Sequence, residues 1–177
     1  LFLCDQNLEY IKPKKITSTH NLLLEVSLAA KHEGQSIIKD YEHLGHHNSE
    51  GICTALARSF ADIGDIVRGR DLYLGNKKYN ETEREKEKLQ TNLKNIFEKL
   101  KSSNPQLTNV SLEKIREYWW ALNRREVWKA IICSAPEDAK YFRKTPCGEG
   151  TTPTQGKCRC VTNDVPTYFD YVPQYLR

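Results

Sequence analysis

Three histidines lie close together at His43, His46 and His47, and histidine is a common metal ligand. His43 and His47 are four residues apart, which is the spacing of a metal-binding pair on one helix. However, Gly45 lies between them and is expected to end the helix, and no carboxylate or third ligand accompanies the pair. The cluster therefore predicts a solvated helix end, with no metal site.

Two carboxylates, Asp62 and Asp65, have a spacing that a general acid and base on one helix would need. A working pair also needs a carboxyl pKa moved by burial or by a like charge. Here Arg58 and Arg68 stand four and three residues away, where helical neighbours of opposite charge meet. The pattern favours ion pairs, so no catalytic residues, no cofactor and no enzymatic activity are predicted.

Basic side chains gather in two clusters that suit a sulfated glycan, because lysine and arginine bind sulfate through charge and paired hydrogen bonds. A solvated face with salt bridges is the alternative interpretation. The net charge of +4 is too small and too dispersed to indicate a nucleic-acid partner. The candidate ligand-binding residues are Lys77, Lys78, Arg84, Lys86 and Lys88 in the first cluster, and Arg124, Arg125 and Lys129 in the second.

The chain has six cysteines, an even number that indicates disulfides formed in an oxidising compartment. The spacing of a zinc site is missing. Cys158 and Cys160 are too close in sequence to bond each other, so one is expected to pair with Cys147. The other is expected to reach Cys4 or a cysteine beyond this chain.

The elements that must position these residues are helices, because apolar residues recur at helical spacing along most of the chain. Residues 145–168 are a loop rich in glycine, proline and cysteine, and no strand is expected. The fold class is therefore all-α, a disulfide-bonded bundle of long helices with irregular Cys-rich loops. The expected helices span residues 18–44, 50–69, 82–102 and 111–132, with a short one over 134–141.

The fourth of these helices is apolar on several sides, which is typical of a helix between neighbours. One stripe contains Leu112, Ile115, Trp119 and Leu122. The run Tyr118-Trp119-Trp120 suits either a sugar-stacking platform or the core, and its spacing beside leucines favours the core.

Several strings resemble a known family. They are Ala57-Arg58-Ser59-Phe60-Ala61-Asp62-Ile63-Gly64-Asp65-Ile66-Val67-Arg68-Gly69, Asp71-Leu72-Tyr73-Leu74-Gly75, Arg116-Glu117-Tyr118-Trp119-Trp120, Val127-Trp128-Lys129-Ala130-Ile131 and Asp170-Tyr171-Val172-Pro173-Gln174-Tyr175-Leu176-Arg177. In this order they resemble the Duffy-binding-like domain, alpha class, of the Plasmodium falciparum erythrocyte membrane protein 1 (var) family.

The resemblance implies one partial Duffy-binding-like domain over 1–177. Its parts would be an irregular end of the first subdomain (1–17), a central helical subdomain (18–145), and a Cys-rich loop with the start of the last helical subdomain (146–177). It also implies a disulfide between Cys53 and Cys133. The chain contains no methionine and ends inside an amphipathic segment, so we expect it to be a piece of a longer polypeptide.

The function that the resemblance implies is adhesion by a parasite protein on the outer face of the infected red-cell membrane. Its partners would be red-cell or endothelial receptors or sulfated glycans, in cytoadherence and rosetting, with antigenic variation of the surface loops. Membrane attachment would depend on other parts of the full-length protein, since no apolar run here reaches transmembrane length. The alternative is a structural spacer whose neighbouring domains bind. The receptor and the oligomeric state do not follow from the sequence.

Overall fold

The computed structural model describes residues 8, 11–43, 49, 51–70 and 81–177, apart from the side chains of residues 81–84. Four α-helices carry this part of the chain: α1 (Thr19–His43), α2 (Ile52–Arg68), α3 (Glu81–Ser102) and α4 (Leu112–Ile131). Short 3-10 turns at Pro13–Lys15, Pro105–Leu107, Phe169–Tyr171 and Gln174–Leu176 complete the regular structure. The described residues form only isolated β-bridges and no strand, so the prediction of an all-α, disulfide-bonded fold is confirmed.

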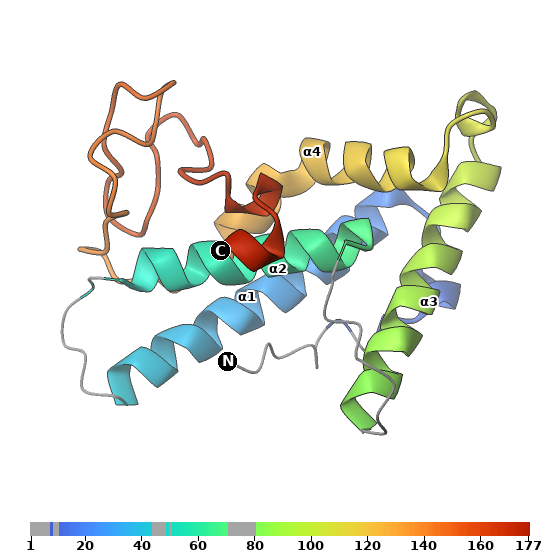
Figure 1. Ribbon diagram of the computed structural model, residues 1–177, viewed down its shortest axis with the longest axis horizontal. Helices are drawn as coiled ribbons and strands as arrows, with labels where there is room; N and C mark the ends of the chain where they lie inside the picture. Colours follow the sequence, from blue (N-terminus) through green and yellow to red (C-terminus); the bar gives the residue numbers. More distant parts are fainter. Residues whose placement is uncertain (1–7, 9–10, 44–48, 50, 71–80) are drawn as a thin grey trace.

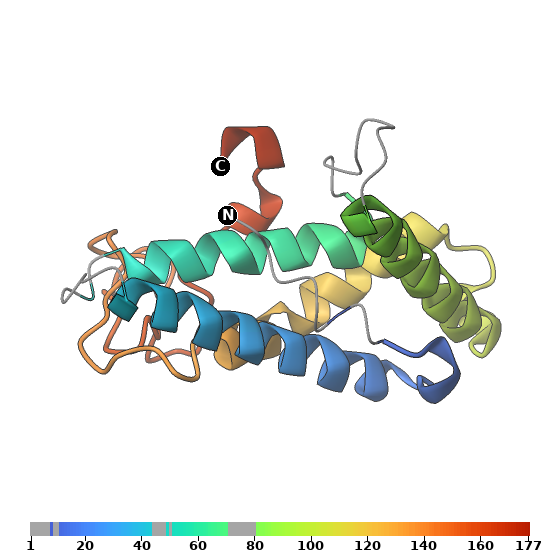
Figure 2. The same cartoon turned by 90° about the horizontal axis from the view of Figure 1, so that it is seen from below.

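The helices α1, α2 and α4 lie lengthwise beside one another, and α3 crosses one end of this layer (Figures 1 and 2). The Cys-rich loop covers the opposite end, and the C-terminal turns lie on α2 (Figure 1). The sequence-based bounds of the four helices are correct to within two residues. None of the described helices is long and apolar enough to cross a membrane.

The core is built around aromatic rings of α2 and α4. Phe60 lies with its ring centroid 5.1 Å from that of Trp120 and 5.3 Å from that of Trp128, and all three side chains are fully or almost fully buried. Trp119 is also buried, against Phe97 of α3 at 6.1 Å. The prediction that Trp119 and Trp120 are core residues is therefore confirmed, and neither forms a sugar-stacking platform.

Leu122 of the predicted stripe and Tyr118 of the aromatic run, which were both expected in the core, are instead exposed. Leu122 is 82% exposed and Tyr118 is 56% exposed. Each is two residues from Trp120, and two helical residues correspond to a rotation of about 200°. Since Trp120 faces the core, both point to the outer side of α4, and their assignment to the core was wrong.

Close approach of the helices depends on glycine at two places. Gly34 in α1 lies against the backbone of Ile131, where an added Cβ would overlap the carbonyl oxygen. Gly64 in α2 faces Trp120, whose Cζ2 atom would lie 2.7 Å from an added Cβ. Gly34 costs α1 some helix propensity, but it allows α1 to pack directly on α4.

The C-terminus of α2 is closed by a glycine and an arginine. Gly69 has φ +74°, the left-handed conformation that ends many helices. Arg116 of α4 donates from Nε to Val67 O at 2.6 Å and from Nη2 to Ile66 O at 3.0 Å, so it caps two of the last carbonyls of α2. Burial lowers the pKa of Arg116 to about 10. This arginine, from the family string at residues 116–120, therefore holds α2 and α4 together.

The segment after α4 forms turns, and the short helix predicted over 134–141 is wrong. Pro136 lacks an amide donor and disfavours helical conformation in its predecessor, so Ala139 N closes only a turn to Pro136 O. The same stretch supports the Cys-rich loop. Lys157 N donates to Pro136 O, and Cys158 N donates to Ala139 O.

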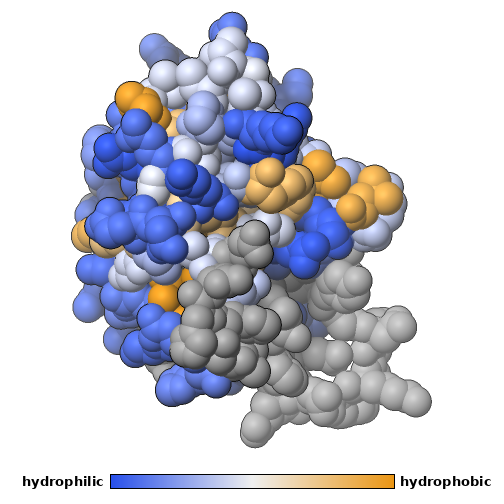
Figure 3. Space-filling model, turned by 90° about the vertical axis from the view of Figure 1, so that its left-hand side faces the viewer, coloured by the Kyte–Doolittle hydropathy of each residue, from blue (hydrophilic) through white to orange (hydrophobic). Residues whose placement is uncertain are grey.

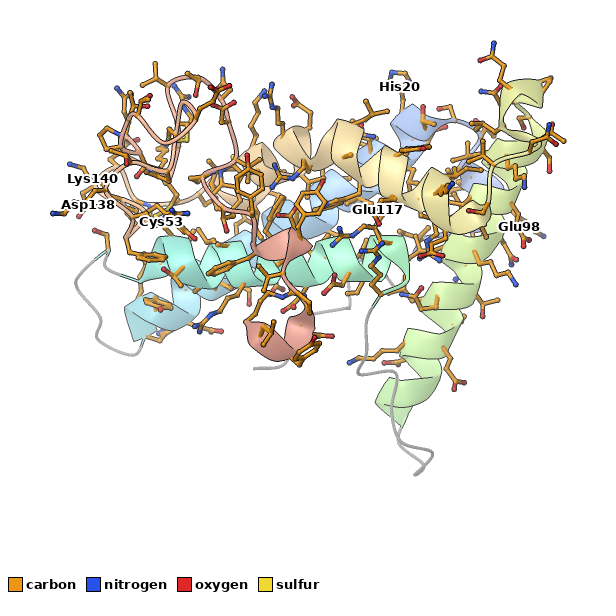
Figure 4. All side chains as sticks on the ribbon, turned by 45° about the horizontal axis from the view of Figure 1, so that its top comes forward. His20, Cys53, Glu98, Glu117, Asp138 and Lys140 are labelled. Atoms are coloured by element: carbon orange, nitrogen blue, oxygen red, sulfur yellow. A yellow bond between two sulfur atoms is a disulfide. The ribbon has the colours of Figure 1, made fainter. Side chains whose placement is uncertain are left out.

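That backbone pairing places Cys158 over the start of α2, where it forms a disulfide with Cys53. The predicted bridge between Cys53 and Cys133 is therefore wrong. Cys133 lies past the end of α4 on a shallow groove between α1 and α4, and it is exposed and unbridged among the described residues. Figure 4 shows Cys53 close to Asp138 and Lys140 of the supporting stretch.

The second disulfide joins Cys147 and Cys160, which confirms that Cys147 pairs with one of the two neighbouring cysteines. It also confirms that Cys158 and Cys160 do not bond each other. The expectation that the remaining cysteine reaches Cys4 or another chain is wrong, because Cys158 takes Cys53. Cys4 lies outside the described residues.

Candidate receptor-binding surface

The second predicted basic cluster lies on α4, and its members have different surroundings. Arg124 is only 12% exposed and grips Asp170, with Nε 2.7 Å from Oδ2 and Nη2 2.8 Å from Oδ1. Its Nη2 also donates to Thr167 O at 2.9 Å. Asp170 accepts a further bond of 2.9 Å from the indole nitrogen of Trp120. Arg124 therefore belongs to the framework that holds the C-terminal segment on the helices.

Arg125 and Lys129 reach the surface. The side chain of Arg125 is 63% exposed, and one of its Nη atoms lies 3.1 Å from Asp164. Lys129 pairs with Glu126 one helical turn earlier, at 2.9 Å. Pairs this exposed contribute little to stability, so both cations stay available to an external anion. Their role in ligand binding remains a prediction.

The first predicted cluster is only partly described. Lys77 and Lys78 lie outside the described residues, as does the side chain of Arg84. Lys86 is half-buried and Lys88 is exposed near the start of α3. Since α3 meets α4 through Phe97 and Trp119, Figures 1 and 2 place the start of α3 far from the later half of α4. Among the described residues, the two clusters do not form one surface.

The candidate acid–base pair serves the fold. Asp65 bonds Arg68 at 3.1 Å and also pairs with Arg177, while Asp62 lies 3.4 Å from Arg177. Burial raises the pKa of Asp65, against the two arginines, which lower it. Arg68 in turn donates to Glu117, which lies above α2 in Figure 4, and to the carbonyl of Asp170. Both carboxylates are thus ion-paired, and the network fastens the C-terminal turns to α2.

The predicted histidine cluster is not assembled in the described part of the chain. His43 is exposed at the last position of α1, and His46 and His47 lie outside the described residues. No group of three metal-ligating side chains occurs among the residues that the structure describes.

The sequence interpretation missed the pocket between α4 and the Cys-rich loop. Its lining includes Arg124, Arg125, Arg143, Asp164 and Tyr168. Only Arg125 and Arg124 had been singled out as ligand-binding residues. The other three stand in an irregular segment, where no periodicity indicates which side chains converge. Figure 3 views the end of the molecule that carries this loop, and the described surface there is mostly hydrophilic, with small separate apolar patches.

The comparisons with known proteins agree with this architecture. The family model of the Duffy binding domain matches residues 1–177. The Duffy receptor gamma form of Plasmodium knowlesi is 30% identical over 109 residues, which are 61% of this chain and 8% of that protein. The beta form from the same organism is 24% identical over 156 residues, 83% of this chain and 12% of that protein. The chain thus spans a small fraction of the length of these relatives.

Two solved structures share the fold. The NTS-DBL1(alpha-1) domain of the Plasmodium falciparum membrane protein 1 (PfEMP1) from the varO strain superposes with a TM-score of 0.80 at 43% identity, over 98% of this chain and 39% of that one. The ICAM-1-binding PfEMP1 IT4var13 DBLbeta domain gives a TM-score of 0.71 at 31% identity, over 99% of this chain and 39% of that one. The family strings found in the sequence also supply buried residues of this fold, such as Arg116, Trp120 and Trp128. The match of the family model over residues 1–177 shows that the chain belongs to the Duffy binding domain family.

Proposed function

We propose that this chain is a host-receptor adhesion module of a Plasmodium surface protein, displayed on the outer face of the infected red-cell membrane. Two relatives are named as Duffy receptors, and one structural neighbour is described as binding ICAM-1. The proposal extends this receptor-binding role to the present chain. Red-cell receptors, endothelial receptors and sulfated glycans are the candidate partners, with cytoadherence or rosetting as the outcome.

The observation that carries the proposal is that the family motifs lie in the buried framework, whereas the exposed side chains are not needed to hold the fold together. Phe60, Arg116, Trp120 and Trp128 are buried, and they hold the helices together. The carboxylates that suggested chemistry are tied into ion pairs. The framework therefore leaves recognition to exposed side chains of α4 and the Cys-rich loop.

A binding screen tests the proposal. The purified protein is applied to a panel of endothelial and red-cell receptor ectodomains, ICAM-1 included, and to a glycan array at low and physiological salt. We expect saturable binding to at least one member, with salt sensitivity if the partner is a sulfated glycan. A parallel sample with both disulfides reduced controls for nonspecific adhesion. Failure to bind any member would instead favour the structural spacer.

A further inference from the structure

A polar pocket of about 440 Å³ lies where the Cys-rich loop turns back over α4. Arg124 and Arg125 of α4 form one wall, and Arg143, the turn at residues 148–150, Asp164 and Tyr168 form the others. Three guanidinium groups therefore converge on one concave site. Its walls come from segments that only the disulfide-pinned fold brings together.

The turn at residues 148–150 is held rigidly. Cys147, bridged to Cys160, accepts a hydrogen bond at its carbonyl oxygen from Gly150 N at 3.1 Å. Gly148 and Gly150 have φ values of +56° and +88°, which only glycine adopts without strain. Side chains are thereby absent from two positions of the pocket wall, so a ligand can approach the backbone closely.

Asp164 ties this turn to the helix. Its carboxylate accepts from Thr162 Oγ1 at 2.7 Å, from Gly148 N at 3.4 Å and from Arg125 Nη2 at 3.1 Å. The hydrogen bond from Thr162 holds the pKa of Asp164 below its ordinary value, so the group is charged at neutral pH. The guanidinium of Arg125 is thus oriented by one nitrogen, and its remaining donors make no hydrogen bond to any other described residue, so they can meet a ligand.

Arg143 supplies a positive charge that no described carboxylate pairs with. It is exposed, and within the described part of the chain its side chain makes no hydrogen bond or ion pair. Arg124, by contrast, is ion-paired with Asp170. The anion-binding capacity of the pocket therefore resides in Arg143 and Arg125.

Tyr168 adds a surface of a different kind. The guanidinium carbon of Arg124 lies 5.3 Å from the ring centroid of Tyr168, yet this side chain is 66% exposed. An exposed aromatic ring beside arginines and carboxylates suits a sugar, whose C–H face packs on the ring while its hydroxyls meet the charged groups. Asp164 and Glu149 would accept hydrogen bonds from the hydroxyls of a sugar, which an acidic peptide such as poly-glutamate lacks.

We propose that this pocket binds an acidic sugar residue of a host glycan. Arg143 and Arg125 hold its sulfate or carboxylate, and the sugar ring packs on Tyr168. The inference rests on the proposed receptor-binding function and assigns that function a site.

The test measures binding of the purified protein to three probes by titration calorimetry: a heparin hexasaccharide, a hyaluronan hexasaccharide and a poly-glutamate peptide. Arg143→Ala should weaken saccharide binding about tenfold or more, since it removes a charge-assisted contact. Arg159→Ala is the matched control, because Arg159 is an exposed arginine of the same loop that does not line the pocket. It should change affinity less than about twofold. Circular dichroism verifies that each variant is folded.

Binding of heparin alone would identify sulfate as the group held, and binding of hyaluronan as well would show that a carboxylate suffices. Equal losses of saccharide affinity in Arg143→Ala and Arg159→Ala would refute the pocket as the binding site. A wild-type protein that binds neither saccharide would refute it as well. Poly-glutamate binding as tight as heparin would overturn the assignment to a sugar. Binding of the same preparations to host cells distinguishes failure of the pocket from failure of the proposed receptor function. If Arg143→Ala leaves cell binding unchanged, the protein binds its receptor through another surface and only the pocket is refuted.

Discussion

Truncation of Arg124 should destabilise the protein far more than truncation of its neighbour Arg125. Arg124→Ala removes both hydrogen bonds to the carboxylate of Asp170, which is fully buried, and leaves that charge with the indole N–H of Trp120. Breaking a buried pair costs about 3–5 kcal/mol. Because Trp120 remains, we expect a value near the lower end, about 3 kcal/mol.

The matched change, Arg125→Ala, breaks a pair whose side chains are 63% and 33% exposed, so its cost should stay below about 1 kcal/mol. Arg124→Lys should fall between the two, since it keeps the charge and loses the paired geometry.

Urea unfolding followed by tryptophan fluorescence measures the difference, because Trp120 and Trp128 are buried. With a slope of about 2 kcal/mol per molar urea, Arg124→Ala should lower the midpoint by roughly 1.5 M and Arg125→Ala by less than about 0.5 M. Equal midpoints for the two variants would refute the structural role of Arg124. Arg124 would then be an exposed cation of the predicted basic cluster.

Three further outcomes are expected. Gly34→Ala should cost about 1–3 kcal/mol in the free energy of unfolding, because its Cβ would overlap the carbonyl oxygen of Ile131. Cys53→Ser opens a bridge that spans 105 residues and should cost up to about 4.7 kcal/mol in chain entropy, whereas Cys133→Ser should have little effect. The lowered pKa of Asp164 means that its ionised form stabilises the fold at neutral pH and that this contribution is lost as the pH falls through the folded-state pKa, below 3.8. Asp164→Asn should therefore be destabilising at pH 7 and neutral near about pH 2, as measured by urea unfolding at both values.

Each of these has a clear contrary result. Equal unfolding midpoints for Gly34→Ala and the wild type would show that α1 and α4 are not in backbone contact. Peptide mapping under non-reducing conditions that finds Cys133 bridged to Cys53 would contradict the disulfide assignment. A constant penalty for Asp164→Asn at both pH values would show that charge is not the source of its contribution.

The four long helices were predictable because each repeats apolar residues at helical spacing, and a periodic signal needs no knowledge of distant neighbours. The stripe that contains Leu122 shows the limit of that signal. Periodicity indicates a helix, but the side that faces the core is decided by the partners of Trp120.

Contacts between distant segments were harder to predict. Arg124 meets Asp170 across 46 residues, and its sequence neighbourhood looks like an ordinary basic cluster. The pairing of Cys53 with Cys158 depends on backbone hydrogen bonds from the loop to Pro136 and Ala139, which place Cys158 beside Cys53. Local sequence does not encode these contacts. The pocket depends on the same loop, which explains why the sequence did not show that Arg143 and Tyr168 converge with Arg125.

The central claim is that this chain adheres to host cells through the surface displayed on its helical framework. Flow cytometry with fluorescently labelled protein on red cells and endothelial cells tests it most directly, with a reduced sample as the control for folding. We expect saturable binding to at least one cell type, and we expect it to be lost when the Cys53–Cys158 and Cys147–Cys160 bridges are reduced. Binding to neither cell type above the level of an unrelated helical protein with the same net charge would contradict it.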